Sequence, residues 1–67
     1  MKNLITIKHD KFGKTYTDKV AVIYPIKKNG KRYANPITVS AVGNEKTQEE
    51  VLLRLQKNNP DCRFELA

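Results

Sequence analysis

The chain has 67 residues, of which 13 are Lys or Arg, seven are Asp or Glu, one is His and one is Cys. A chain of this length forms one small domain, residues 1–67, and has no room for the deep cleft between two lobes that many enzymes use. A single Cys excludes an internal disulfide and a single His offers no pair of metal ligands, so we expect neither a metal nor a cofactor.

The basic residues are concentrated in the first half of the sequence. The formal net charge is +6 and the pI is about 9.7. Residues 1–32 contain nine basic and two acidic side chains, whereas residues 33–67 contain four basic and five acidic ones. An anionic partner such as nucleic acid would therefore meet the first half of the chain.

No stretch of the sequence has the pattern of a targeting or membrane segment. The apolar residues that follow Met1 and Lys2 are interrupted by Thr6 and Lys8, and no apolar run is long enough to span a bilayer. One unpaired thiol fits a reducing compartment. We therefore expect a soluble cytoplasmic protein without membrane contact.

The first predicted strand spans residues 2–8, where apolar and polar residues alternate and Ile5 and Ile7 share a face. The turn-rich residues 9–13 make a connection short enough for the next strand to pair antiparallel with the first. Residues 14–18 show no clear alternation, so they are either a ragged strand start or a loop. The second strand is clear only from Lys19.

A long β-hairpin is predicted over residues 19–42, because Asn29-Gly30 between two apolar-rich runs suits a two-residue type I′ turn. Counting outward from this turn places Val22 opposite Ile37. The face expected to pack on the core then carries Val20, Val22, Tyr24, Ile26, Tyr33, Asn35, Ile37, Val39 and Ala41. The face expected to be exposed and basic carries Lys19, Ala21, Ile23, Pro25, Lys27, Arg32, Ala34, Pro36, Thr38 and Ser40.

A helix is predicted over residues 48–58. Thr47 and Glu50 have the spacing of a capping box, and Pro60 ends the helix because proline disfavours helical geometry in the residue before it. The apolar stripe consists of Val51, Leu52 and Leu55, with Leu53 at its margin.

A short terminal strand is predicted where Cys62, Phe64 and Leu66 alternate with polar residues. Because it follows a helix that returns from the third strand, it should run parallel to the first and third strands and pair with one of them. The predicted order is β-β-β-α-β, an α+β fold in which a small, mainly antiparallel sheet carries one helix on one face.

The exposed basic face of the hairpin is the candidate binding site. A two-stranded β-ribbon fits the major groove of DNA, where Lys and Arg contact phosphates or guanine edges and hydroxyls donate to phosphates. The candidate nucleic-acid-binding residues are Lys19, Lys27, Lys28, Lys31, Arg32, Thr38 and Ser40. The alternative interpretation is a solvated hairpin whose charges prevent edge-to-edge pairing.

Aromatic side chains could also contact nucleic acid by stacking on bases. The counted register places Tyr24 and Tyr33 on the core face, where packing is the better interpretation, whereas Tyr16 and Phe12 are open to either role.

No arrangement typical of catalysis is found. Cys62 is interpreted as a buried small apolar residue because it alternates with Phe64 and Leu66, and His9 as a solvated loop residue because no catalytic partner can be assigned to it beyond neighbouring Asp10. There is no spaced carboxylate pair and no glycine-rich phosphate loop, so we expect no enzyme activity.

Two functions fit these observations. The first is a small nucleic-acid-binding module, with DNA as the expected partner. The second is a protein-binding accessory or inhibitor, of the kind that phages and mobile elements encode, which docks an acidic surface or adds an edge strand to its partner's sheet. A homodimer formed through an edge strand is compatible with both.

Overall fold

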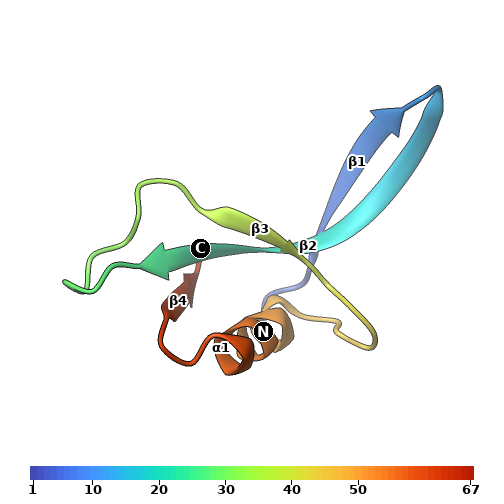
Figure 1. Ribbon diagram of the computed structural model, residues 1–67. Coiled ribbons are helices and arrows are strands. Elements are labelled where there is room, and N and C mark those ends of the chain that lie inside the picture. Colours follow the sequence, from blue (N-terminus) through green and yellow to red (C-terminus); the bar gives the residue numbers. More distant parts are fainter.

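The computed structural model describes residues 1–67 and contains four strands and one helix (Figure 1). The elements in chain order are β1 (Ile5–Lys11), β2 (Lys14–Ile26), β3 (Ile37–Ser40), α1 (Gln48–Asn58) and β4 (Arg63–Leu66). All strand pairs are antiparallel, and the helix packs on one face of the sheet. These features confirm the predicted α+β fold and its β-β-β-α-β order.

β2 is the strand with which all three others pair. β1 pairs with residues 14–20 of β2, β3 with residues 20–23, and β4 with residues 23–26. Val20 is paired on both sides, by Ile5 of β1 and Ser40 of β3, and Ile23 likewise pairs with both β3 and β4. β1 and β4 therefore lie one after the other along one edge of β2, while β3 occupies the opposite edge.

The predicted partner of the terminal strand is wrong. β4 runs parallel to β1 and β3, as predicted, but it pairs with β2 instead of either of them. The physical reason is that the pairing of β1 ends at Val20, which leaves the same edge of β2 free from Ile23 to Ile26. The helix returns the chain to this free edge.

The predicted turn of the central hairpin is also wrong. Only Gly30 has a positive φ, of 86°, whereas a type I′ turn would require one at Asn29 as well. The Gly30 N–H donates to the Lys27 carbonyl at 2.9 Å, and the Lys27 N–H donates to the Lys31 carbonyl at 2.8 Å. The loop therefore contains three residues, 28–30, which is the next most common hairpin connection.

A second irregularity lies between this turn and β3. The Tyr33 N–H donates to the Pro25 carbonyl at 3.1 Å, and Ile37 is paired with Ile23. Three residues, 34–36, therefore face the single residue Tyr24. Pro36 contributes no backbone donor to this segment, which is consistent with the interruption of the ladder.

The resulting register exchanges the two faces of β2 relative to the prediction. Ala21 and Ile23 point toward the helix and expose no surface, whereas Val22 and Tyr24 lie on the opposite face, which no helix covers. We call this second face the open face of the sheet. For β3 the prediction is right, since Val39 packs against the core.

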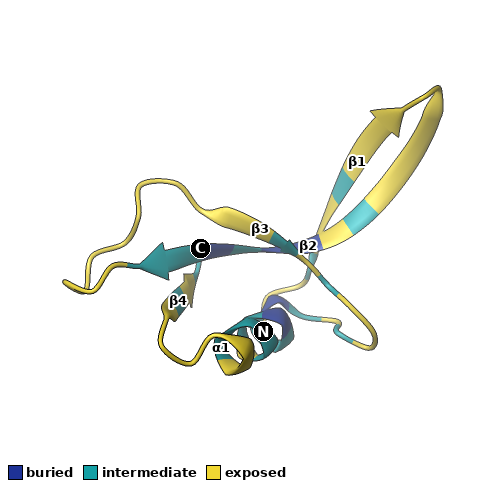
Figure 2. Cartoon of the chain, in the orientation of Figure 1, coloured by how far each residue is buried: buried dark blue, intermediate teal, exposed yellow.

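The core is small and lies between α1 and the middle of β2. Ala21, Ile23 and Val51 are fully buried, and Val20, which the prediction placed on the core face, is buried as well, at 2% exposure. The partly buried residues around the first three are Leu4, Val39, Ala41, Leu52, Leu55, Phe64 and Leu66. Figure 2 shows the buried positions gathered in the middle of β2 and the first turn of α1. Leu53 is 70% exposed, consistent with its predicted place at the margin of the helix stripe.

The predicted helix and its N-cap are confirmed. The Glu50 N–H donates to the Thr47 hydroxyl at 3.3 Å, and this hydroxyl donates to a Glu50 carboxylate oxygen at 3.2 Å. The Glu50 carboxylate also accepts from the Lys46 N–H at 3.4 Å, and Lys46 is one residue before the N-cap. These bonds satisfy amides that the first helical turn leaves without partners.

Gln48 fills the gap between β1 and β4 along the edge of β2. The Val22 N–H points into this gap and donates to the Gln48 Oε1 at 3.1 Å, while the Gln48 Nε2 donates to the Asn3 carbonyl at 2.9 Å. The Gln48 side chain is buried, with 6% of the residue exposed. One side-chain amide thus joins the helix start to β2 and to the segment that enters β1.

We expect Gln48→Met to destabilise the fold strongly, because it preserves the side-chain volume but leaves the Val22 N–H and the Asn3 carbonyl without partners. A buried group left unsatisfied costs about 1–3 kcal/mol, and this cost falls on the Val22 N–H, since Asn3 is exposed and water can reach its carbonyl. Gln56→Met is a matched control, since the Gln56 amide reaches carbonyls of the exposed turn after α1, where water can replace it. Urea unfolding measures both variants, and equal losses would contradict the role assigned to Gln48.

Candidate nucleic-acid interface

Cationic side chains that are not ion-paired within the chain can bind an anionic partner. Two ion pairs are present, Arg54 with Glu45 and Arg32 with Glu65. No Lys side chain lies within ion-pairing distance of an Asp or Glu carboxylate, although the Lys2 ammonium donates to the Ala67 oxygen. The other lysines and Arg63 are therefore the cations available to an anionic partner.

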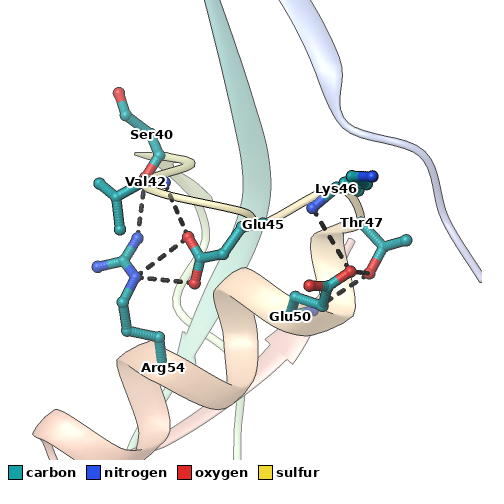
Figure 3. Close-up of polar contacts among 7 residues, drawn as sticks. All are labelled: Ser40, Val42, Glu45, Lys46, Thr47, Glu50 and Arg54. Atoms are coloured by element: carbon teal, nitrogen blue, oxygen red, sulfur yellow. Dashed lines mark hydrogen bonds and ion pairs between the residues drawn. The ribbon is translucent and has the colours of Figure 1, made fainter.

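Arg54 has a structural role at the loop between β3 and α1 (Figure 3). Its Nε donates to both Glu45 carboxylate oxygens, at 2.9 and 3.2 Å, and its guanidinium also donates to the Ser40 carbonyl at 2.9 Å. Glu45 accepts in addition from the Val42 N–H at 2.9 Å. The Arg54 guanidinium, and then the Val42 amide, lower the pKa of the Glu45 carboxyl below its ordinary value.

Arg32, a predicted contact residue, is occupied by contacts within the chain. Its Nε donates to the Glu65 carboxylate at 3.0 Å, and its guanidinium lies 4.8 Å from the centre of the Tyr24 ring. All three side chains lie on the open face, so the predicted burial of Tyr24 against the helix is wrong. About half of the Arg32 side chain is exposed, so it can contact a ligand only beside Glu65.

The other predicted residues of this hairpin do not form one surface. Lys28 and Lys31 are exposed at the turn, and Lys27 lies 5.3 Å from the centre of the Tyr33 ring. Thr38 and Ser40 lie on the open face, where the Ser40 hydroxyl donates to Asp18 at 2.8 Å.

Lys19 lies on the helix side of β2, two residues before Ala21, and it is exposed. The predicted continuous basic face of the hairpin is therefore wrong. The cause is the three-residue loop, which shifts the register by one and sends alternate side chains to the other face.

A second β-hairpin protrudes from the covered part of the fold (Figure 1). It consists of β1 and the first half of β2, residues 5–20, and we call it the arm. Most residues of the arm are exposed (Figure 2). The whole molecule measures 44 Å along its longest axis. The sequence predicted a loop over residues 9–13, but residues 9–11 belong to β1 and the turn contains only Phe12 and Gly13.

The arm carries four lysines that sequence reasoning did not group together: Lys8, Lys11, Lys14 and Lys19. Cross-strand pairing places Lys11 opposite Lys14 on one face, whereas Lys8 and Lys19 lie on the other face. The signal that could have identified the arm is the presence of Lys11 and Lys14 immediately on either side of Phe12-Gly13. The arm was missed because its strands carry polar residues on both faces, so apolar and polar residues do not alternate along them.

The two acidic residues of the arm are held by hydroxyl groups. The Thr15 hydroxyl donates to Asp10 at 2.8 Å, and the Ser40 hydroxyl donates to Asp18 at 2.8 Å. Neither carboxylate forms an ion pair with a lysine. The arm therefore keeps an excess of positive charge that its own side chains do not neutralise.

The tip of the arm is a two-residue turn with a positive φ at both positions, 53° for Phe12 and 74° for Gly13. Positive φ at both centres defines the type I′ class, which favours Asn-Gly or Asp-Gly. A residue with a bulky side chain pays about 1–2 kcal/mol in this left-handed region. The Phe12 side chain is 99% exposed, so no packing within the chain offsets that cost.

At the opposite end of β2, a hollow of about 430 Å³ opens between the β2–β3 turn and the segment after α1. Its lining is partly apolar, and its charged residues are Lys27, Lys28, Arg63 and Asp61. Tyr33 lines this hollow and is half exposed, so it is not part of the core. The hollow thus combines apolar surface with an excess of positive charge.

Cys62 and His9 are both exposed. Cys62 precedes β4, in the turn where the Gln56 side chain donates to its carbonyl, so the predicted burial of the thiol is wrong. His9 belongs to β1, opposite Tyr16, and not to a loop. No three side chains of His, Cys, Asp or Glu are grouped closely enough to hold a metal ion.

Comparison of the chain with protein-family models, with curated proteins and with solved structures found no match. The single helix, of 11 residues, is neither long nor apolar enough to cross a bilayer.

Acid should destabilise the fold through Glu45 and Glu49, whose pKa values are both lowered from 4.5. Glu49 accepts from the Lys2 backbone N–H at 2.9 and 3.0 Å, which is the main cause of its lowered pKa. A carboxyl with a lowered folded pKa stabilises the fold above its ordinary pKa, and this contribution is lost as the pH falls through the folded value.

We therefore expect the melting temperature to fall as the pH is lowered below about 5. The double variant Glu45→Gln/Glu49→Gln should be less stable at neutral pH and should show a smaller fall over the same range. Thermal unfolding followed by circular dichroism measures this, and parallel pH profiles for the two proteins would contradict the assignment.

Proposed function

We propose that this protein binds nucleic acid, with DNA as the expected partner, and that it does so by contacting phosphates with the lysines of the arm. The observation that carries the proposal is a protruding two-stranded ribbon with four lysines, none of which is ion-paired within the chain. Neutralisation of phosphates by Lys and release of their counterions supplies most of the free energy of non-specific binding.

The distribution of the lysines supports insertion of the arm into a groove. A two-stranded ribbon fits the width of the major groove, whose walls carry phosphates on both sides. Lys11 and Lys14 lie on one face of the ribbon and Lys8 and Lys19 on the other, so each wall would meet positive charge. The net charge of +6 adds long-range attraction toward a polyanion.

The lysines at the other end of β2 have a supporting role in this proposal. Lys27, Lys28 and Lys31 are exposed at the β2–β3 turn, at the end of the strand opposite to the arm tip. Because β2 has 13 residues, the two ends lie about 40 Å apart. A short oligonucleotide would contact the arm alone, and a longer one could also reach this turn.

A second candidate function, docking of an acidic protein surface, is supported by the hollow of about 430 Å³ beside Lys27 and Lys28. An apolar side chain flanked by carboxylates would suit its lining and its charge. An accessory or inhibitor protein of this kind would be retained weakly on immobilised DNA and would lose its partner when Lys27 and Lys28 are replaced by Glu. The arm lysines would not matter to it.

The salt dependence of DNA binding tests the first candidate. We expect fluorescence anisotropy with a labelled duplex to show binding whose log–log salt slope is reduced by about 2 in the Lys11→Gln/Lys14→Gln variant, close to one unit per lost phosphate contact. The control Lys46→Gln/Lys57→Gln removes the same charge from the loop before α1 and from its last turn, and should leave the slope unchanged.

Equal slopes in the two variants would show that net charge, and not the arm, determines binding. Flat anisotropy of the wild-type protein across the salt series would exclude nucleic acid and favour the protein-docking function.

A further inference from the structure

The tip of the arm contains two features that oppose folding. Phe12 occupies the left-handed backbone region, which is strained for a bulky side chain, in a turn that Asn would form with less strain. Lys11 and Lys14 lie directly opposite each other in the last pair of the ribbon, where like charges repel. Neither feature is offset by a contact within the chain.

The exposure of Phe12 is the second observation. At 99% exposure it is the most exposed large apolar side chain of the protein, and it lies in the turn at the end of the arm. A strained, exposed aromatic residue between two cations is poorly explained by stability, and strain of this kind tends to occur where a ligand is bound. The tip therefore has the composition of a contact element.

We propose that Phe12 stacks its ring on the face of a nucleobase while Lys11 and Lys14 contact the phosphates on either side of it. This inference rests on the proposed nucleic-acid function and assigns its substrate class. Separating stacked bases costs free energy, so the tightest ligand should be a duplex in which the stack is already interrupted by an unpaired base. A single apolar wedge at the end of a basic ribbon suits such a site.

A lipid surface is a less suitable partner for the same tip. A bilayer would meet the arm from one direction, so its lysines would be expected around one face beside the aromatic residue. The arm instead carries two lysines on each face of the ribbon, and Phe12 is its only large apolar residue at the tip. Phosphates that line both walls of a groove match this arrangement better.

The test compares a labelled intact duplex with the same duplex carrying one unpaired base at its centre. We expect the wild-type protein to bind the interrupted duplex more tightly. Phe12→Asn should lose this preference and bind the interrupted duplex about tenfold more weakly, which is the effect expected when one base–aromatic contact is removed. Its salt slope should be unchanged, because no charge is lost.

The same variant should be more stable than the wild type, with a melting temperature higher by roughly 5 °C, because Asn-Gly suits the turn and no packing is lost. A variant that is more stable and yet binds less tightly separates a recognition role from a structural one. Phe12→Tyr keeps the aromatic face and should keep the preference for the interrupted duplex. Lys11→Gln/Lys14→Gln should keep the preference at reduced affinity.

Three outcomes would overturn the inference. If Phe12→Asn binds both duplexes as the wild type does, the ring does not contact bases, although the basic arm still binds phosphates. If the wild-type protein binds neither duplex, the nucleic-acid function fails as well. If vesicles containing phosphatidylserine bind the wild type but not Phe12→Asn, while DNA affinity is unchanged, the tip inserts into lipid instead.

Discussion

The structure depends on one constraint, which is that β2 must have hydrogen-bond partners along an edge that no single strand covers. β1 supplies them up to Val20 and β4 from Ile23 onward, and the Gln48 side chain supplies the acceptor for the Val22 N–H between them. The Gln48 backbone N–H also donates to the Lys2 carbonyl at 2.9 Å. The start of the helix, the N-terminal segment and the middle of β2 are thus joined where the core is buried.

This arrangement divides β2 into one half that contributes to the core and another half that forms the arm. The half from Val20 onward is covered by α1 and flanked by β3 and β4, and it contains the fully buried Ala21 and Ile23. In the half before Val20, β1 is the only partner strand of residues 14–18, and the Lys19 carbonyl also accepts from the Ala41 N–H at 2.8 Å. Side chains on both faces of that half are free from packing requirements, so they can be charged without loss of core stability. The excess of lysine in the arm is compatible with the fold for this reason.

Sequence signals that act over a few residues correctly predicted the element that depends on such short-range interactions, the helix. The helix was predicted over its observed range because Thr47, Glu50 and Pro60 act within a few residues of each other. The register of β2 could not be predicted in this way. Residues 20–23, Val-Ala-Val-Ile, are apolar at both the odd and the even positions, so the hydrophobic pattern does not show which face of the strand packs on the core. The register then depended on the turn, and Asn29-Gly30 forms a longer loop than the one assumed.

The candidate site was predictable only in its chemistry. An excess of positive charge in residues 1–32 is visible in the sequence, but the predicted contact residues are divided among a turn, the open face and the arm. Lys8, Lys11 and Lys14 could be grouped only once residues 9–11 and 14–18 were known to be paired strands, because their polar composition resembles that of a loop. The ribbon that carries these lysines is formed by backbone pairing, which cannot be predicted from the pattern of side chains.

At the arm tip, the residue type disagrees with the backbone conformation and the exposure of its position. At Thr47 and Gly30, residue type and backbone conformation agree, and both positions are explained by folding alone. At Phe12 the turn geometry, the exposure of the ring and the facing lysines all disagree with what stability favours. Because the arm lies outside the core, this strain is confined to a ladder that can open locally without exposing Ala21, Ile23 or Val51. The fold can therefore carry an unfavourable tip at little cost to its core, and such a position suits a residue selected for binding.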